Sequence, residues 1–184
     1  MRVTTLSPTF SVSERVVELI NQTIRRERLE PHQRAFFVAQ LLVDSDRLTF
    51  TDEPWAPDTL NHQQHYDHPI FGNSHPNDVE RFKARGFGRV VGRAHYLAFS
   101  RWSGINCAKD PELLTQVDIS YLSWLWLWKK RNGNKCADQA LLNFDSATVK
   151  FIGWPDRLAE RQFAWQMQLT QENAHGVENT KRIE

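Results

Sequence analysis

A group of histidines between residues 62 and 75 has the clearest metal-binding chemistry in this sequence. Histidines occupy positions 62, 65, 68 and 75, and Asp67 lies beside the third of them. Imidazole nitrogens and a carboxylate together can bind Zn²⁺, but no cysteine and no HExxH pattern accompanies them. We therefore interpret the cluster as a hydrogen-bonding or stacking surface, and we expect neither a metal ion nor another cofactor.

A second unusual segment, FKARGFGRVVGRAHYLAF, covers residues 82–99. Glycines at 86, 88 and 92 alternate there with arginines at 85, 89 and 93. Clustered arginines can bind nucleic acid, but the net charge of the chain is only +1 and acidic residues surround the segment. We expect no nucleic-acid partner, so the glycines and arginines need another explanation.

Helices must position both segments. Ser11 or Ser13 can cap a first helix that extends to about Arg28, and Pro31 opens a second, HQRAFFVAQLLVDS, which is apolar on nearly every side. Residues 44–81 lack periodic apolar spacing and predict a long irregular loop. Four further helices are predicted within residues 93–104, 110–133, 136–153 and 155–171. The SWLWLW run alternates like a strand, but the DPELL start before it favours a buried helix.

The sequence predicts a mainly α protein with one domain, residues 1–172, and a polar tail, residues 173–184. A chain of 184 residues suits one domain with a sizeable core. The longest apolar run, YLSWLWLW, is far too short to cross a bilayer, so we expect no membrane insertion. The N-terminal residues lack the apolar core of a secretory signal. Cys107 and Cys136 leave the question of a disulfide open.

The glycine-rich segment also carries a family resemblance. RFKARGFGRVVGRAHY resembles the YRGRGFIQLTGRANY signature of glycoside hydrolase family 19, the chitinase and phage endolysin group with a lysozyme-like fold. RAFFVAQLLVDSDRLTFTDE is similar to AAFLAQIAHESGGFRYTEE of that family, and FGNSHPNDVERFKARG to GNTQPGDGYRYRGRG. Later, DPELL and PDRLAERQ resemble NPDLA and LADRLARY, so the match spans residues 30–165 in one order. The resemblance implies a single lysozyme-like domain.

The resemblance implies that the glycine-rich segment lines a glycan-binding cleft. Gly86 and Gly92 would allow tight backbone conformations and close approach of two segments, which a Cβ would block. We interpret Arg85 and Arg93 as structural, with guanidinium groups that bridge carbonyls and carboxylates around the bend. Solvated surface arginines are the alternative.

Two carboxylates are implied as the catalytic pair. Asp44 occupies the place of the family's acid, a glutamate, and Glu53 lies where family members carry a second polar group, with Asp46 as a nearby spare. A glycosidase needs one group to protonate the leaving oxygen and another to hold or activate water. Because Asp44 is one methylene shorter than glutamate, its reach is reduced. The alternative is that all these acids are solvated loop residues.

The implied substrate-binding positions are Ser45, Tyr66, Arg89 and Val91. The family carries a sugar-binding glutamine and a water-positioning threonine where this chain has Arg89 and Val91. Valine cannot hydrogen-bond to water. Arg89 could bind a sugar hydroxyl, or it could pair with Asp44 and keep that acid ionised. The site therefore looks divergent.

Two functions follow from these expectations. The first is a β-1,4-glycosidase that acts on peptidoglycan or chitin, and the second is an inactive relative that binds glycan or a protein partner. Without a secretory signal, we expect synthesis in the cytoplasm and, for a cell-wall substrate, delivery to the periplasm or wall by a phage-type or injection route.

Overall fold

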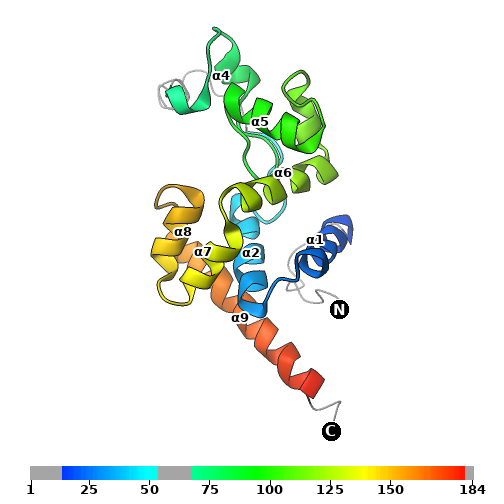
Figure 1. The fold of residues 1–184 in the computed structure, drawn as a ribbon, viewed down its shortest axis with the longest axis vertical. Coiled ribbons are helices and arrows are strands. Elements are labelled where there is room, and N and C mark those ends of the chain that lie inside the picture. Colours follow the sequence, from blue (N-terminus) through cyan, green and yellow to red (C-terminus); the bar gives the residue numbers. More distant parts are fainter. Residues whose placement is uncertain (1–13, 54–67, 181–184) are drawn as a thin grey trace. The chain divides into compact units, whose positions relative to one another are not determined.

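The protein is mainly α-helical, as the sequence predicts (Figure 1). The structure, a computed structural model, describes residues 14–53 and 68–180, except for the side chains of 175–180. Within these ranges the helices are α1 (Glu14–Glu27), α2 (Pro31–Asp44), η1 (Pro69–Phe71), α4 (Asp78–Arg81), α5 (Arg93–Ser103), η2 (Pro111–Thr115), α6 (Val117–Lys130), α7 (Gly133–Ala140), α8 (Phe144–Ile152) and α9 (Leu158–Thr180). The chain packs as two compact units, one of Met1–Val43 with Trp128–Glu184 and one of Asp44–Leu127.

Aromatic rings fill the core of the first unit. Phe36 and Phe37, both fully buried, lie on α2, whose sequence is apolar on nearly every side. The ring of Trp128 lies 4.9 Å from that of Phe37 and 5.5 Å from that of Phe151 on α8. In Figure 1, α7 and α8 run side by side within this unit. The expectation that α2 is a buried core helix is confirmed.

One arginine is buried in the first unit together with polar partners. Arg161 on α9 donates from Nη1 to Oε1 of Gln40 at 2.7 Å, and Gln40 donates to the hydroxyl of Thr148 at 3.2 Å. The guanidinium also contacts Oδ2 of Asp156 at 3.3 Å. Because a buried charge without partners is costly, these contacts explain how α9 can present an arginine to α2.

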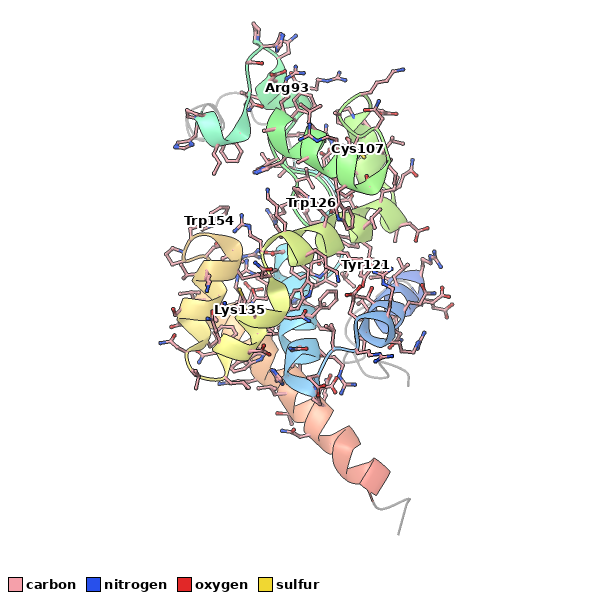
Figure 2. All side chains as sticks on the ribbon, in the orientation of Figure 1. Arg93, Cys107, Tyr121, Trp126, Lys135 and Trp154 are labelled. Atoms are coloured by element: carbon pink, nitrogen blue, oxygen red, sulfur yellow. The ribbon has the colours of Figure 1, made fainter. Side chains whose placement is uncertain are left out.

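The core of the second unit lies between α5 and α6. Tyr96 and Phe99 of α5 are fully buried, and Trp126 of α6, labelled in Figure 2, lies 5.8 Å from Phe99 between ring centroids. Phe82 packs against Tyr96 at 5.1 Å. The SWLWLW run is helical, so its alternating appearance does not mark a strand.

Two of the predicted helices are each divided in the structure. Residues 110–133 form η2 and then α6, because Gln116 has extended backbone angles. Residues 136–153 belong to α7 and α8, since Asn143 is extended and its side chain accepts the amide of Ser146 to begin α8. A side-chain cap inside an apolar run was not recognised as a helix boundary. The last helix continues to Thr180, past residue 171, where the sequence predicted its end.

Both cysteines are buried free thiols. Burial, together with the charge of Asp110, raises the pKa of the Cys107 thiol to about 11, so this sulfur stays protonated at neutral pH. In the described part of the chain, no helix combines the length and the apolar character needed to cross a lipid bilayer.

Candidate functional site

Asp44 is the last residue of α2, and a tight reversal follows it. Ser45 is fully buried and holds the reversal: its Oγ accepts the amide of Leu48 at 2.9 Å, and its carbonyl accepts the amide of Phe50 at 2.8 Å. Asp46, Arg47 and Leu48 all have positive φ, at 46°, 59° and 70°. L-residues rarely take this conformation, so the contacts of Ser45 must stabilise it. The sequence predicted Ser45 as a substrate contact, and here its side chain serves the backbone.

A small antiparallel arrangement brings the second carboxylate to the glycine-rich segment. Arg85 forms isolated bridges with both Asp52 and Val90. The amide of Glu53 donates to the carbonyl of Ala84 at 3.0 Å. These bonds place Glu53 beside residues 84–90, although more than thirty residues separate them in sequence.

The glycines permit close packing within the second unit. Gly86 has a φ of 72°, and a Cβ there would lie 2.5 Å from Oγ of Ser123. A Cβ on Gly88 would lie 2.4 Å from the carbonyl oxygen of Ser123 on α6. At Gly92, with a φ of 81°, the Cβ would lie 2.5 Å from that of Phe71. Any side chain at these three positions would force segments apart, which explains the glycines.

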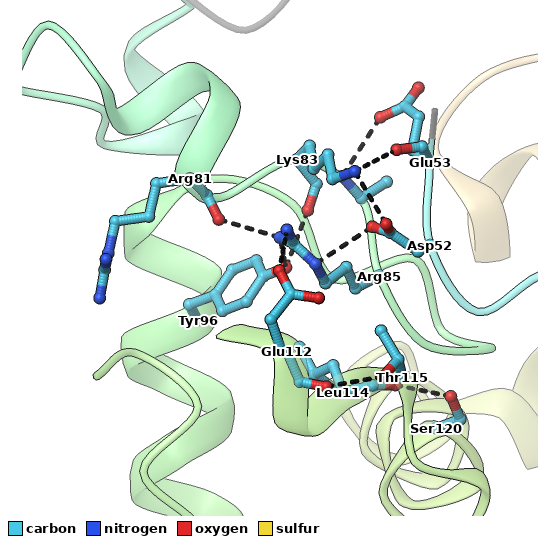
Figure 3. A network of polar contacts seen from close by, with 11 residues as sticks. Asp52, Glu53, Arg81, Lys83, Arg85, Tyr96, Glu112, Leu114, Thr115 and Ser120 are labelled. Atoms are coloured by element: carbon cyan, nitrogen blue, oxygen red, sulfur yellow. Dashed lines mark hydrogen bonds and ion pairs between the residues drawn. The ribbon is translucent and has the colours of Figure 1, made fainter. Parts of the chain in front are cut away.

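Arg85 lies at the centre of a polar network, shown in Figure 3. Only 4% of this residue is exposed. Its guanidinium donates to the carbonyl of Arg81 at 2.9 Å and to the hydroxyl of Tyr96 at 3.1 Å, and it pairs with Glu112 at 2.6 Å and with Asp52 at 3.1 Å. Burial raises the pKa of the Tyr96 hydroxyl well above its usual range, so this group remains a neutral partner.

Arg93 forms a second polar centre at the start of α5. Its guanidinium donates from Nε to the carboxylate of Asp78 at 2.7 Å, and Nη2 makes a second bond to that carboxylate. Asp78 is buried and also accepts the amides of Ser74 and His75, at 2.8 and 3.1 Å. Chiefly because of Arg93, the pKa of Asp78 lies well below its usual value, although burial opposes this shift. Arg85 thus has both carbonyl and carboxylate partners, and the guanidinium of Arg93 has a carboxylate partner.

The side chain of Arg89 contacts Asp44 directly. Its Nε donates to the backbone carbonyl of Asp44 at 2.7 Å. The guanidinium carbon lies 4.1 Å from the centroid of the Phe50 ring, which is the geometry of a cation–π contact. Arg89 itself has a φ of 45° and is exposed. The guanidinium of this exposed residue is therefore held by one hydrogen bond and one ring contact.

The carboxylates of Asp52 and Glu53 differ in their partners. Lys83 donates from Nζ to Oδ2 of Asp52 at 2.8 Å and to the carbonyl of Glu53 at 2.6 Å. Oε2 of Glu53 accepts the amide of Ala84 at 3.2 Å. Sequence reasoning missed Lys83, because nothing in the KARG tetrapeptide indicates that its ammonium reaches back across thirty residues. The cation fixes the position of both acids.

The remaining predicted positions differ in how far the structure describes them. Val91 is half-buried, and its carbonyl accepts Nδ1–H of His95 at 2.9 Å. Tyr66, like His62 and His65, lies outside the described residues. His68 is described and uses Nδ1 to accept the amide of Ile70 at 3.2 Å. In residues 14–53 and 68–180 no three His, Cys, Asp or Glu side chains gather as a metal-binding group would.

Comparison with known proteins identifies the fold. No protein-family model and no curated sequence matches this chain. Among solved structures, a crystal structure of a chitinase C mutant matches with a TM-score of 0.55 and 21% sequence identity, covering 77% of this chain. The chain has a chitinase-like fold, in agreement with the lysozyme-like fold that the sequence predicts. It covers 59% of the length of that chitinase chain, and at this identity the match establishes the fold alone.

Proposed function

We propose that this chain binds a β-1,4-linked amino-sugar glycan, of the peptidoglycan or chitin type, and hydrolyses it with Asp44 as the general acid. The observation that carries the proposal is the chitinase-like fold, in which Asp44 ends the buried helix α2 beside the glycine-rich segment. The fold supplies the expectation of a glycan, and the carboxyl group supplies the chemistry.

The reaction assigns separate tasks to the acids. Asp44 would protonate the leaving glycosidic oxygen, and Glu53 would hold or activate the attacking water on the opposite face of the sugar. The contacts of Glu53 with Ala84 and of Lys83 with its carbonyl fix it in one place, which favours positioning of water over free movement. Asp52 is less suited to this task, because it pairs with both Lys83 and Arg85.

A second candidate function is glycan binding without hydrolysis. It is favoured by Val91, which offers no hydroxyl to position water. On this alternative the same surface holds the glycan, and Asp44 is a buried structural acid at the end of α2.

The decisive experiment measures both binding and release of reducing ends, with chito-oligosaccharides and with purified peptidoglycan. Asp44→Asn keeps the shape of the side chain but cannot donate the proton, so we expect activity to fall by about 100-fold or more while binding persists. The matched control is Asp46→Asn, which alters an exposed acid two residues away and should leave activity unchanged.

The outcomes separate the candidates. Hydrolysis that depends on Asp44 and not on Asp46 supports the glycosidase. Binding without hydrolysis by the wild-type protein establishes the second candidate, and hydrolysis that survives Asp44→Asn removes the acid assignment. If neither glycan is bound or cleaved, the proposed function is wrong.

A further inference from the structure

Arg89 presents a fixed positive charge beside Asp44, and we infer that it selects a glycan that carries carboxylates, as peptidoglycan does, over neutral chitin. This inference rests on the proposed function, which leaves the substrate class open between these two polymers.

The guanidinium of Arg89 is held at two points that use little of its bonding capacity. Nε donates to the Asp44 carbonyl at 2.7 Å, and one face of the group lies 4.1 Å from the Phe50 ring centroid. Guanidinium has five N–H donors in a planar fork, and in the part of the chain that the structure describes no hydrogen bond uses the four on the terminal nitrogens, which a ligand could therefore accept. Within the described residues, Nε supplies the hydrogen bond of Arg89, and no carboxylate forms an ion pair with it.

Two nearby cations, Arg85 and Lys83, form ion pairs with acidic side chains of the protein. Arg85 is divided between Asp52, Glu112, Tyr96 and a backbone carbonyl, and Lys83 is engaged by Asp52. Their charges are therefore balanced by acids of the chain. Arg89 contacts a carbonyl and a ring, neither of which carries a negative charge, so no acid of the described residues 14–53 and 68–180 balances its charge.

This arrangement fits a carboxylate better than a hydroxyl. A terminal guanidinium edge binds a carboxylate through two parallel hydrogen bonds, and charge-assisted bonds are about twice as strong as neutral ones. Stacking on Phe50 fixes the plane of the fork, so less side-chain freedom is lost when the ligand binds. A neutral amino-sugar chain offers only hydroxyl and amide groups and gains less from this charge.

Peptidoglycan supplies carboxylates from two sources. The lactyl ether on alternate sugars ends in a carboxylate when no peptide is attached, and the stem peptide carries carboxylates of its own. Both sources share the chemistry that Arg89 would recognise. Glycan chains stripped of stem peptides and chains that retain them therefore form two arms of the test, beside neutral chito-oligosaccharides of the same length.

The test measures dissociation constants by titration calorimetry with the full chain. Wild type should bind at least one carboxylate-bearing glycan about tenfold or more tightly than the neutral one, and this preference should shrink as salt is added. Arg89→Gln should abolish the preference while neutral binding persists. Arg89→Lys, which keeps the charge but loses the planar fork, should retain part of it.

The matched control is Arg101→Gln, which removes one exposed positive charge from α5 in the same unit and should leave the preference intact. If wild type binds the glycan without stem peptides more tightly, the lactyl carboxylate is the group that Arg89 recognises. If it binds the glycan with stem peptides more tightly, the recognised carboxylate belongs to the peptide. Equal binding of neutral and anionic glycans by wild type, or an unchanged preference in Arg89→Gln, overturns the inference and leaves the proposed function in place. If wild type binds none of the three glycans, both fail.

Discussion

The two compact units of this protein are stabilised by different kinds of contact. The first is built on rings: Phe36, Phe37, Trp128 and Phe151 approach one another at centroid distances from 4.9 to 6.2 Å. The second also contains packed rings, but its irregular segments depend on ion pairs and on glycines that allow close approach.

This difference between ring packing and ion pairing bears on which unit can hold a cluster of polar side chains. Ring packing on regular helices resists change, and the buried polar groups of the first unit, Arg161, Gln40 and Thr148, are engaged with one another. Irregular backbone held by buried arginines can bring acids and cations from distant positions together, as Lys83 and Asp52 show. The second unit accordingly carries Asp44, Glu53 and Arg89.

The largest expected effect is in the ring-packed unit. Trp128→Ala should lower the free energy of unfolding by about 4 kcal/mol, because it removes a fully buried ring and leaves a cavity beside Phe37 and Phe151. Denaturant titration measures the loss, which should be similar at pH 7 and pH 4. Trp154→Ala, at a residue that is 55% exposed in the same unit, is the control and should change stability little. If the loss of unfolding free energy in Trp128→Ala depended strongly on pH, the stability of the first unit would not rest mainly on ring packing.

The next largest effect should come from the Arg93–Asp78 pair. Asp78→Asn should cost about 3 kcal/mol, since it leaves the partly buried guanidinium of Arg93 without its charged partner. Urea titration at pH 7 measures this loss. Glu80→Gln alters an exposed acid of the same helix and should be nearly neutral.

The same pair predicts an acid dependence. The pKa of Asp78 is lowered in the folded state, so its stabilisation is complete above the ordinary carboxyl value of 3.8 and is lost as pH falls below that value. Wild type should therefore lose more stability than Asp78→Asn between pH 5 and about pH 2. If the free energy of unfolding falls equally with pH in both proteins, Asp78 does not contribute to the acid dependence.

The smallest expected effects separate steric contact from backbone conformation. Gly88→Ala should cost about 2 kcal/mol, because the new Cβ meets the Ser123 carbonyl at 2.4 Å. Gly104→Ala should cost about 1 kcal/mol, because φ is 75° but no atom lies within 4 Å. Thermal unfolding of both variants tests the order. An equal or smaller loss for Gly88→Ala would mean that the glycine-rich segment can move away from α6.

Helix existence could be predicted from the sequence, but helix boundaries could not always be. Apolar spacing after Pro31 was sufficient for α2, and Gly104 marked the end of α5. The break at Gln116 and the cap at Asn143 were missed, because each lies within a continuing apolar pattern. Each of these helix boundaries is set by a single hydrogen bond or a single ψ angle, which the spacing of apolar residues does not predict.

For the candidate site, the sequence predicted which residues belong to it better than it predicted the contacts that they make. Asp44, Glu53, Arg85 and Arg89 were chosen from sequence, and the structure places Glu53 and Arg89 against neighbouring parts of one antiparallel arrangement. The sequence did not indicate that Arg89 binds the Asp44 carbonyl rather than offering only a charge. That contact is a single hydrogen bond to a backbone carbonyl, which no residue type in the segment signals.

The left-handed turn of Asp46, Arg47 and Leu48 links durability to selectivity. A glycine at Arg47 would relieve a conformational cost of about 1 kcal/mol, partly offset by the greater freedom it gives the unfolded chain. The same glycine would loosen the segment that carries Phe50, the ring against which Arg89 stacks. On the proposed role of Arg89, a more thermostable protein obtained this way would bind carboxylate-bearing glycans with less discrimination. Selection for heat resistance and selection for substrate choice would then favour different residues at position 47.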